Sequence, residues 1–312
     1  MDGTLAITDF NWYRTLLESG PHEEVNFWLP SARRAFRTPL HSPFFFKLRH
    51  PHNVIAGFGL FQRYVPLPDW LAWDAFGVKN GCDSYRTMRE RISHIREGYR
   101  YVEEGGSNEI GCVVIARPVF FHESEWVSQP TDWKVRIQRG KKYDLTAGEG
   151  HRIWKECQER LQQRNHQHLL LGVAPEHPDP VEFMLTTARR RLGQGTFRVE
   201  VTQAYDRACA VTGEHSLPAL EAAHIRPVSE EGPMSVPNGI LLRADLHRLF
   251  DKGYMTLTPE HILEVSQRLK QDFSNGKSYY PLHGHVLNLP QDASQRPDPN
   301  FLAWHNENCY MG

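Results

Sequence analysis

The chain has 312 residues, of which 40% are hydrophobic and 23% charged, so it can bury a core and its composition does not indicate disorder. Its formal charge of -1 removes the argument for nucleic-acid binding that a strongly basic total would give, although a local basic face is still compatible with it. No apolar run approaches the length of about 18 residues that spans a membrane, and no signal peptide is expected at the amino terminus.

Cysteine usage gives no sign of cross-links. The five cysteines lie far apart and form no CxxC pair, at positions Cys82, Cys112, Cys157, Cys209 and Cys309. A disulfide scaffold or a thiolate zinc site is therefore not indicated. We expect a reduced, cytoplasmic setting.

The first half of the chain predicts a mixed, mostly β domain over residues 1–158. Three short aromatic or β-branched runs indicate strands, at residues 44–48, 54–61 and 110–116. Apolar residues recur at helical spacing over residues 84–97, and Gly98 is a suitable stop for that helix.

The middle of the chain predicts a connection between two domains, over residues 159–190. A polar run around Trp154 suggests a helix, and the three prolines of residues 174–180 cannot lie inside one. A second helix is expected over residues 181–191.

The last part, residues 191–312, predicts a compact α+β domain. Its expected elements are a helix or strand at 197–205, a short strand at 220–225, a turn at 236–239, a helix at 243–250, a strand at 254–257, and loops from 272 onward. The fold class of the whole chain is therefore predicted to be α+β.

Three polar residues stand at regular intervals in that domain. His224 follows the short strand, Asn238 lies 14 residues further on, and His247 lies nine residues beyond it on the expected helix. Asp251 is four residues after His247 and therefore on the same helix face.

This layout suits a phosphodiesterase that uses one metal ion. A neutral histidine can take a proton from water near pH 7, and a divalent ion can stabilise the charge of the transition state. His247 and Asp251 could share such an ion, and Asn238 could hold a histidine ring or join the metal shell. Arg226, Arg243 and Arg248 could contact phosphate.

The segment from Tyr205 to Thr258 resembles the HNH nucleases with a ββα-metal finger, in the branch without zinc-binding cysteines. The resemblance rests on the runs Ala-Val-Thr-Gly at 210–213, Ala-Ala-His-Ile-Arg-Pro at 222–227, and Asn-Gly-Ile-Leu-Leu-Arg-Ala-Asp-Leu-His-Arg-Leu-Phe-Asp-Lys-Gly at 238–253. It implies that His224 is the general base, that Asn238 is the family's asparagine, and that His247 binds the metal. It also implies a DNA substrate and a divalent ion, Mg²⁺ or alternatively Mn²⁺.

One position departs from that pattern. Many HNH proteins place a carboxylate or histidine directly before the base, where it binds the metal, and here that residue is Ala223. Glu221, two residues earlier on the strand, or Asp251 could complete the metal shell.

The amino-terminal domain resembles the PUA superfamily, which includes the SRA and EVE modules that bind modified bases. The segment Arg-Gly-Lys-Lys-Tyr-Asp at 139–144 fits that resemblance. Basic residues that could neutralise phosphates are Arg33, Arg34, Lys47, Arg49, Lys134, Arg136, Arg139, Lys141 and Lys142, and candidates for stacking on an extruded base are Trp12, Trp28, Phe46 and Trp73. Aromatic residues in short strands are otherwise core residues.

The sequence therefore predicts a modification-dependent DNA endonuclease that acts on double-stranded DNA, with no membrane partner. Cutting both strands with one active site per chain favours a homodimer. Two alternatives stay open: a reader of modified DNA that does not cleave, motivated by Ala223, and a non-specific HNH nuclease.

Overall fold

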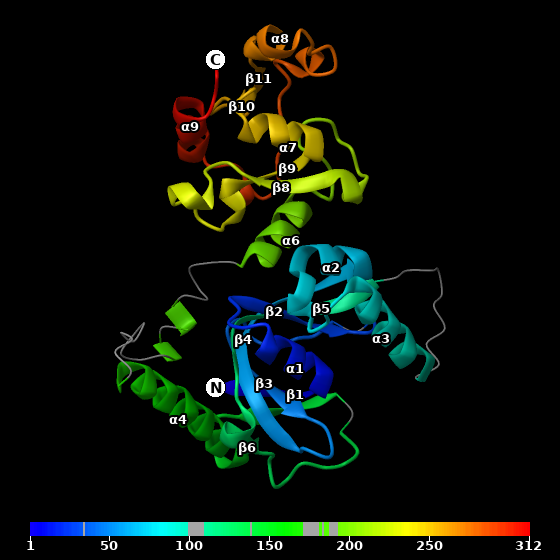
Figure 1. The fold of residues 1–312 in the computed structure, drawn as a ribbon, viewed down its shortest axis with the longest axis vertical. Helices are drawn as coiled ribbons and strands as arrows, with labels where there is room; N and C mark the ends of the chain where they lie inside the picture. Colours follow the sequence, from blue (N-terminus) through cyan, green and yellow to red (C-terminus); the bar gives the residue numbers. More distant parts are fainter. Residues whose placement is uncertain (34, 99–108, 138, 171–180, 183, 187–192) are drawn as a thin grey trace. The chain divides into compact units, whose positions relative to one another are not determined.

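The computed structural model describes residues 1–33, 35–98, 109–137, 139–170, 181–182, 184–186 and 193–312. The chain forms two compact units, Met1–Arg190 and Arg191–Gly312, each with its own hydrophobic core (Figure 1). Both units combine helices and strands, which confirms the predicted α+β class. Among the residues that the structure describes, no helix combines the length and the apolarity needed to span a membrane.

The first unit is built on a seven-stranded sheet with the order β2-β5-β4-β3-β1-β7, and β6 pairs with β4 outside this path. The strands are β1 (Asp2–Thr8), β2 (Glu24–Leu29), β3 (Pro43–Leu48), β4 (Val54–Pro68), β5 (Glu109–Phe120), β6 (Val127–Ser128) and β7 (Gly140–Asp144). β1 and β3 run parallel and the other pairs run antiparallel. The three strands expected from the sequence are confirmed as β3, β4 and β5.

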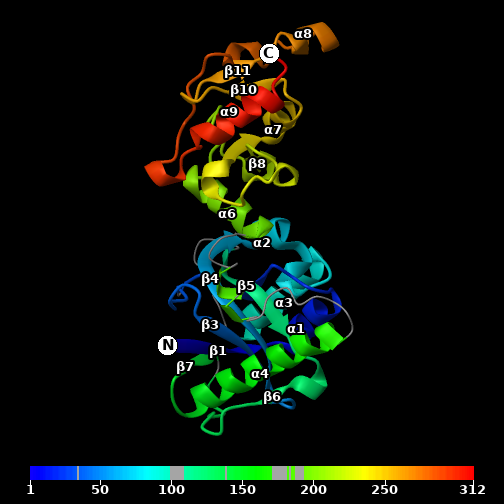
Figure 2. The same cartoon turned by 90° about the vertical axis from the view of Figure 1, so that its left-hand side faces the viewer.

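Both faces of this sheet are covered, which follows from the run of phenylalanines in β3. Because side chains alternate along a strand, Phe44 and Phe46 point to one face and Phe45 to the other. The first face packs on α1 (Phe10–Glu18) through Trp12, and the second packs on α4 (Gly148–Leu170) through Trp154. Helices α2 (Asp69–Phe76) and α3 (Tyr85–Gly98) follow β4, and α3 confirms the helix expected there (Figure 2).

The expected boundary after residue 158 falls inside a helix. Helix α4 continues through it, and its residues Ile153 and Cys157 are fully buried in the core of the first unit. The proline-rich connection at 174–180, and residues 183 and 187–191 of the helix expected over 181–191, lie outside the described residues.

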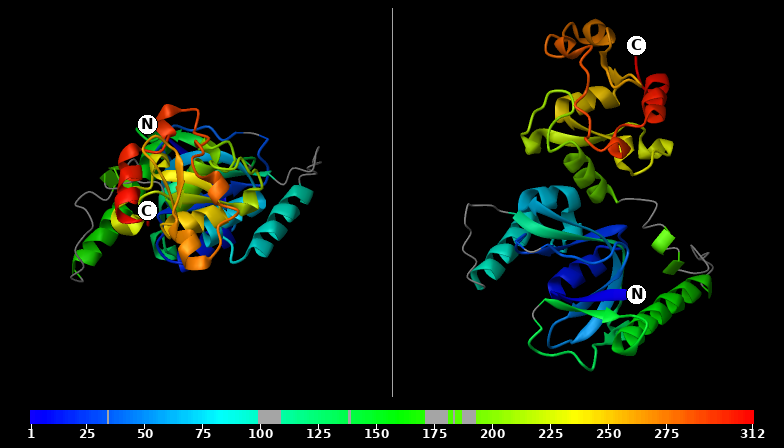
Figure 3. Two further views of the ribbon diagram at one scale, coloured as in Figure 1. Left: turned by 90° about the horizontal axis from the view of Figure 1, so that it is seen from above. Right: turned by 180° about the vertical axis from the view of Figure 1, so that it is seen from behind.

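The second unit contains a hairpin followed by a helix. Its elements are α6 (Gln194–Ala204), β8 (Leu220–His224), β9 (Gly239–Arg243), α7 (Ala244–Asp251), β10 (Met255–Leu257), β11 (Leu263–Val265), α8 (Arg268–Phe273) and α9 (Pro299–Asn308). β8 pairs with β9 and β10 with β11, both antiparallel. Figure 3 shows the ribbon of this unit, coloured from green to red, in two further views.

Two expectations for this unit need correction. The turn expected at residues 236–239 is confirmed by a 3-10 turn at Val236–Asn238, but the expectation left out the second strand, β9, into which it leads at Gly239. The expectation of loops from residue 272 onward is wrong, because α9 lies in that tail. Its start is set by Asp298, whose side chain accepts from the Asn300 amide, and by Pro299 in the first turn.

Candidate active site

The candidate residues of the second unit lie on one ββα arrangement. In the β8–β9 ladder His224 stands opposite Gly239, directly after Asn238. Helix α7, which carries His247 and Asp251, begins at the residue that follows β9. The hairpin and the helix therefore bring together side chains that are up to 27 residues apart in sequence.

His224 is held on one face and at one edge of its ring. The ring stacks on Phe197 of α6, with centroids 4.0 Å apart and planes at 8°, and Nε2 lies 3.2 Å from the sulfur of Met234. Burial, together with the nearby His247, lowers the pKa of His224 below its usual value, against the opposing charge of Asp251. The ring is therefore neutral at pH 7 and able to accept a proton.

His247 has a carboxylate at each ring nitrogen. Nδ1 lies 2.7 Å from Oε2 of Glu221 on β8, and Nε2 lies 3.3 Å from Oδ2 of Asp251, one turn further along α7. Burial on its own would lower the pKa of His247, but the hydrogen bonds and charges of the two carboxylates outweigh it and raise the pKa above its usual value. The cluster of His247 with the Glu221 and Asp251 carboxylates therefore attracts positive charge.

The nearest pair of donors, an imidazole nitrogen and a carboxylate oxygen, can share a divalent ion. Two neighbouring ligands of an octahedral Mg²⁺, each about 2.0–2.1 Å from the metal, stand about 3 Å apart, which is close to the 3.3 Å between His247 Nε2 and Asp251 Oδ2. Glu221 at hydrogen-bond distance from Nδ1 matches the carboxylate that orients a metal-binding histidine through its other nitrogen. No cluster of three or more acidic, histidine or cysteine side chains among the described residues is arranged to hold a metal. Mg²⁺ usually keeps several waters and takes only one or two protein carboxylates, so two protein ligands are sufficient.

Asn238 does not contact the ring of His224, contrary to one expected role. Its side chain is fully buried and bonds only to backbone: Oδ1 accepts from the Arg226 amide, and Nδ2 donates to the carbonyls of Arg226 and Pro233, each at 2.9 Å. Through these three hydrogen bonds the side-chain amide of Asn238 bridges the loop between β8 and β9. Asn238 therefore fixes the loop, and its effect on the histidine is indirect.

Residues 209–258 of the chain match the model of a family described as HNH endonuclease. The chain carries an HNH endonuclease domain. It is thus a nuclease, a hydrolase that cleaves DNA, and HNH endonucleases generally use a divalent metal ion. No curated protein matches the chain.

Solved structures with low similarity were also found. ASCH from Zymomonas mobilis is 13% identical, with a TM-score of 0.31, and the match covers 48% of this chain and 94% of that one. A point mutant of the same protein is 11% identical, with a TM-score of 0.32 and coverage of 48% and 96%. A modification-dependent restriction endonuclease, TagI, is 10% identical, with a TM-score of 0.29 and coverage of 99% and 81%.

The residue before His224 is a core position in this domain. Ala223 has no exposed surface and belongs to the apolar cluster of the unit, together with Ile240 of β9 and Leu246 of α7. A carboxylate at this position would be buried among apolar side chains at a large cost. The carboxylates near His247 come instead from Glu221 and Asp251.

The three arginines expected to contact phosphate differ in the partners of their guanidinium groups. Arg243 forms a two-pronged ion pair with Asp245, which lowers the pKa of that carboxyl. Arg226 donates to the Glu230 carbonyl and lies over the ring of Trp304. Arg248 is exposed on α7, and no ion-pair partner for its guanidinium is found in the described part of the chain.

The amino-terminal unit contains a cavity of about 560 Å³. Its wall includes Trp12, Phe27 and Trp28, and the acidic, basic and imidazole side chains around it are Asp9, Arg33, Arg49, Arg91, His94 and Arg139. Both indole N–H groups already donate hydrogen bonds: that of Trp12 to the Asn26 carbonyl at 3.2 Å, and that of Trp28 to the Asn80 carbonyl at 3.0 Å. Trp28, which is half-buried, therefore presents ring surface rather than a hydrogen-bond donor, whereas Trp12 is buried and belongs to the core.

Three of the other candidates for stacking or phosphate binding lie outside the cavity. Phe46 is fully buried and stacks on Phe120, so its ring is part of the core. Lys47 is also buried, and its ammonium donates to Asn53 and lies over Trp133. Trp73 lies on α2 and not in the cavity wall.

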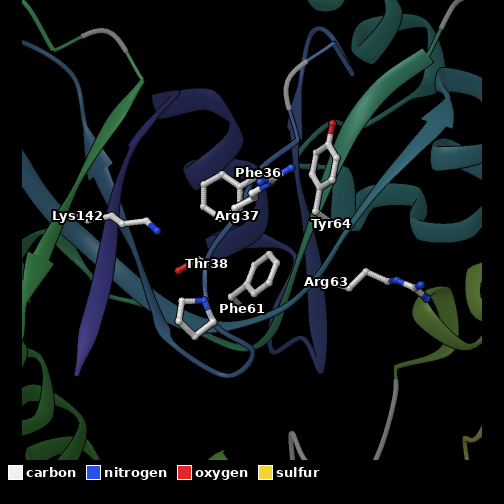
Figure 4. A pocket seen from close by; sticks show the side chains of 8 residues that line it. Phe36, Arg37, Thr38, Phe61, Arg63, Tyr64 and Lys142 are labelled. Atoms are coloured by element: carbon white, nitrogen blue, oxygen red, sulfur yellow. The ribbon is translucent and has the colours of Figure 1, made fainter.

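A second, more open hollow on the same unit combines rings and cations (Figure 4). The rings of Phe36, Phe61 and Tyr64 surround it, and Lys142 extends toward it from β7 (Figure 4). Phe36 packs on Phe61, and the Tyr64 hydroxyl donates to the Ala32 carbonyl, so these rings serve the fold.

Two neighbours of the active site were not predicted from the sequence. Phe197 was assigned only to an element of undecided type, and Met234 lies in a loop whose sequence carries no periodic signal. Their roles depend on how α6 and the loop fold back onto His224.

Proposed function

We propose that the protein is a modification-dependent DNA endonuclease in which His224 is the general base and a divalent ion, Mg²⁺ or alternatively Mn²⁺, is held by His247 and Asp251. The observation that carries the nuclease site is the placement of His247 between Glu221 and Asp251, beside a neutral His224. Glu221 orients His247 by accepting from Nδ1, which leaves Nε2 available to the ion.

The proposed reaction is a hydrolysis by attack of water on phosphorus. His224 takes a proton from the water, the water oxygen bonds to phosphorus, the bond from phosphorus to the 3′ oxygen breaks, and that oxygen is protonated from solvent. When bound, the ion would neutralise the charge that develops on the phosphate and on the departing oxygen. Arg248, exposed on α7, is available to contact the phosphate backbone.

The nuclease half is tested by cleavage of duplex DNA with Mg²⁺ and Mn²⁺. We expect His224→Ala to reduce the cleavage rate at least a hundredfold, the usual size of a general-base contribution. His215→Ala, at an exposed histidine of the same unit, is the matched control and should cleave like the wild type. Equal cleavage by His224→Ala and wild type would show that the base is another group.

Recognition of the modified base is proposed to take place in the cavity of the amino-terminal unit. A base extruded from the duplex needs a ring surface for stacking and cations near the mouth for the flanking phosphates. Trp28 supplies the first, and the exposed Arg49 and Arg139 supply the second. At about 560 Å³, the cavity lies within the usual range of small-molecule sites, about 300–1,000 Å³.

A panel of duplexes that carry cytosine, methylated cytosine, hydroxymethylated cytosine or methylated adenine tests this half. We expect the wild type to cleave one modified duplex in preference to plain DNA. Trp28→Ala should remove that preference and Trp28→Phe, which keeps an aromatic ring, should retain most of it, while Trp73→Ala outside the cavity should behave like the wild type. Equal cleavage of all duplexes by the wild type would instead support a non-specific nuclease.

A homodimer is the proposed cleaving species, because one chain with one such site can cut only one strand at a time. Sedimentation of the full chain on a cleavable duplex should give two chains per duplex. A second-strand cut that follows first-strand nicking at a rate independent of protein concentration would contradict it.

A further inference from the structure

The edge of the His224 ring faces an unusual neighbour. Nε2 lies 3.2 Å from the sulfur of Met234, in the loop between β8 and β9. A thioether sulfur has no hydrogen to give and acts only as a weak acceptor. If Nε2 carried a lone pair, two lone pairs would face each other at this distance, so the contact favours the tautomer in which Nε2 carries the proton.

We propose that Met234 is a positioning residue that holds His224 with Nε2–H directed at its sulfur, so that Nδ1 is the nitrogen that takes the proton from water. The inference rests on the proposed function, in which His224 is the general base. It assigns the reacting atom, and it assigns a role to a side chain outside the three polar positions of the site.

The ring has little freedom to escape this arrangement. Phe197, itself 1% exposed, covers one face at a centroid distance of 4.0 Å and fixes the plane of the imidazole. A half-turn about the bond that joins the ring to Cβ keeps the plane but puts a ring carbon where Nε2 now meets the sulfur. The face contact therefore fixes the tilt of the ring, and the sulfur contact selects between the two remaining orientations.

The loop that carries Met234 is itself held in place. The Pro233 carbonyl, directly before Met234, accepts from Nδ2 of Asn238, and the same amide spans the loop to Arg226. At Gly232, a side chain would begin 1.8 Å from the Arg226 carbonyl oxygen, so only glycine allows the backbone to approach this closely. The sulfur is thus positioned by a fixed backbone rather than by a mobile segment.

Proton transfer is balanced without further groups. When Nδ1 takes the proton from water, the imidazolium carries N–H on both nitrogens, and the bond from Nε2 to sulfur is kept. Sulfur is a weak acceptor and stabilises the imidazolium less than an amide oxygen would. The charged or titratable groups that act on this ring are His247 and Asp251, and neither changes when Met234 is replaced.

The experiment compares wild type, Met234→Leu and Met234→Gln in the full chain. Leucine keeps the volume but removes the acceptor, and glutamine supplies a stronger acceptor at similar length. We expect Met234→Leu to lower kcat by about tenfold with KM little changed, which is part of the roughly 10²–10⁴-fold contribution of a general base. Met234→Gln should recover kcat and shift the acidic limb of the pH profile of kcat/KM to higher pH.

Nitrogen NMR of chains labelled at histidine supplies the readout that a purely structural role would not move. In wild type at high pH the His224 signals should be those of the Nε2–H tautomer, and in Met234→Leu they should move toward averaged values. Met255→Leu, at a buried methionine of the same unit, is the matched control and should change neither signal nor rate.

Unchanged kcat together with an unchanged tautomer in a folded Met234→Leu chain would overturn the proposal and leave the proposed function intact. The proposal would also be overturned if Met234→Leu lost activity but kept wild-type histidine signals, and if Met234→Gln did not recover that activity. Full activity of His224→Ala would instead remove the proposed function on which the inference rests, so the two failures are distinguishable.

Discussion

Oε2 of Glu221 lies 2.7 Å from Nδ1 of His247, across 26 positions of sequence and between a strand and a helix. The bond fixes which nitrogen of His247 carries a proton, and it directs Nε2 toward Asp251 at 3.3 Å. In the proposed site, Glu221 orients His247, and Asp251 is the carboxylate next to the nitrogen that would bind the metal.

Glu221→Gln should weaken metal-dependent cleavage by about 10–100-fold, because loss of a carboxylate behind a metal-binding histidine typically costs that much in affinity or activity. The measurement is the cleavage rate as a function of Mg²⁺ concentration, with a higher midpoint expected for the variant. Glu260→Gln, an exposed carboxylate of the same unit, should leave the midpoint unchanged. Asp251→Asn should cost more than Glu221→Gln, and the reverse order would exchange the two assigned roles.

Metal binding should release a proton from His247. Its raised pKa means that the free protein holds a proton there below that pKa, and the proton must leave before a ring nitrogen can bind a cation. The apparent affinity for Mn²⁺ should therefore fall as the pH decreases through the raised pKa. Calorimetry in two buffers with different ionisation enthalpies should give a net proton release on binding in that range, and Glu221→Gln should move the range to lower pH. Proton release that is absent throughout would exclude His247 as a ligand.

The sequence predicted where the polar residues of the candidate site lie better than which residues support them. His224, His247 and Asp251 could be placed because helix spacing and a short strand are local properties. The hydrogen-bond partners of Asn238 were not predicted, because they are backbone groups of a loop whose path depends on tertiary contacts. Phe197 and Met234 could not have been found for the same reason: each meets His224 only after α6 and the loop have packed.

The fold shows the same division between local and distant effects. Strands β3, β4 and β5 and helices α3 and α7 carry strong periodic or aromatic patterns and were predicted. Strand β9 was missed because the Asn-Gly turn signal at 238–239 lies at its start, and α9 was missed because its polar sequence has no clear apolar stripe. Lys47 was a candidate for neutralising phosphates, but β3 lies in the middle of a covered sheet, where its ammonium donates to Asn53 and lies over the ring of Trp133.

Gly239→Ala should destabilise the hairpin that carries His224. A methyl group at Gly239 would lie 2.4 Å from a methyl carbon of Val201 and 2.9 Å from the ring of Phe197, so the side chains that support the histidine must move. Such overpacking typically costs about 1–3 kcal/mol. Hydrogen exchange of the β8 and β9 amides measures this loss of stability within the second unit alone. Val201→Ala makes room, so the double variant should lose less than the sum of the two single variants.

The second unit should lose stability as the pH falls from about 7 to 4. Burial lowers the pKa of His305 to about 4, against its hydrogen bond to Phe250 and the charge of Asp251, whereas the unfolded chain has the usual value near 6.5. In that window the unfolded state binds a proton that the folded state does not, which destabilises the fold by about 3 kcal/mol at most. Denaturant unfolding at several pH values should show this loss as a slope of the free energy of unfolding against pH. His305→Gln should reduce that slope, and His215→Gln should leave it unchanged. A wild-type slope in His305→Gln would assign the acid sensitivity to another group.

Arg248→Ala should weaken DNA binding in a way that depends on salt. Its guanidinium is exposed on α7 beside the site, whereas that of Arg243 is held by both oxygens of Asp245 and must leave them to reach a phosphate. Each phosphate contact contributes about -0.9 to the slope of log affinity against log salt, so Arg248→Ala should reduce the slope by about one and Arg243→Ala by less. Binding of one duplex in Ca²⁺, at a series of salt concentrations, measures the slopes. Arg268→Ala, at an exposed arginine that pairs with Asp272, is the matched control and should leave the slope unchanged. An unchanged slope for Arg248→Ala would mean that the phosphates follow another path across this unit.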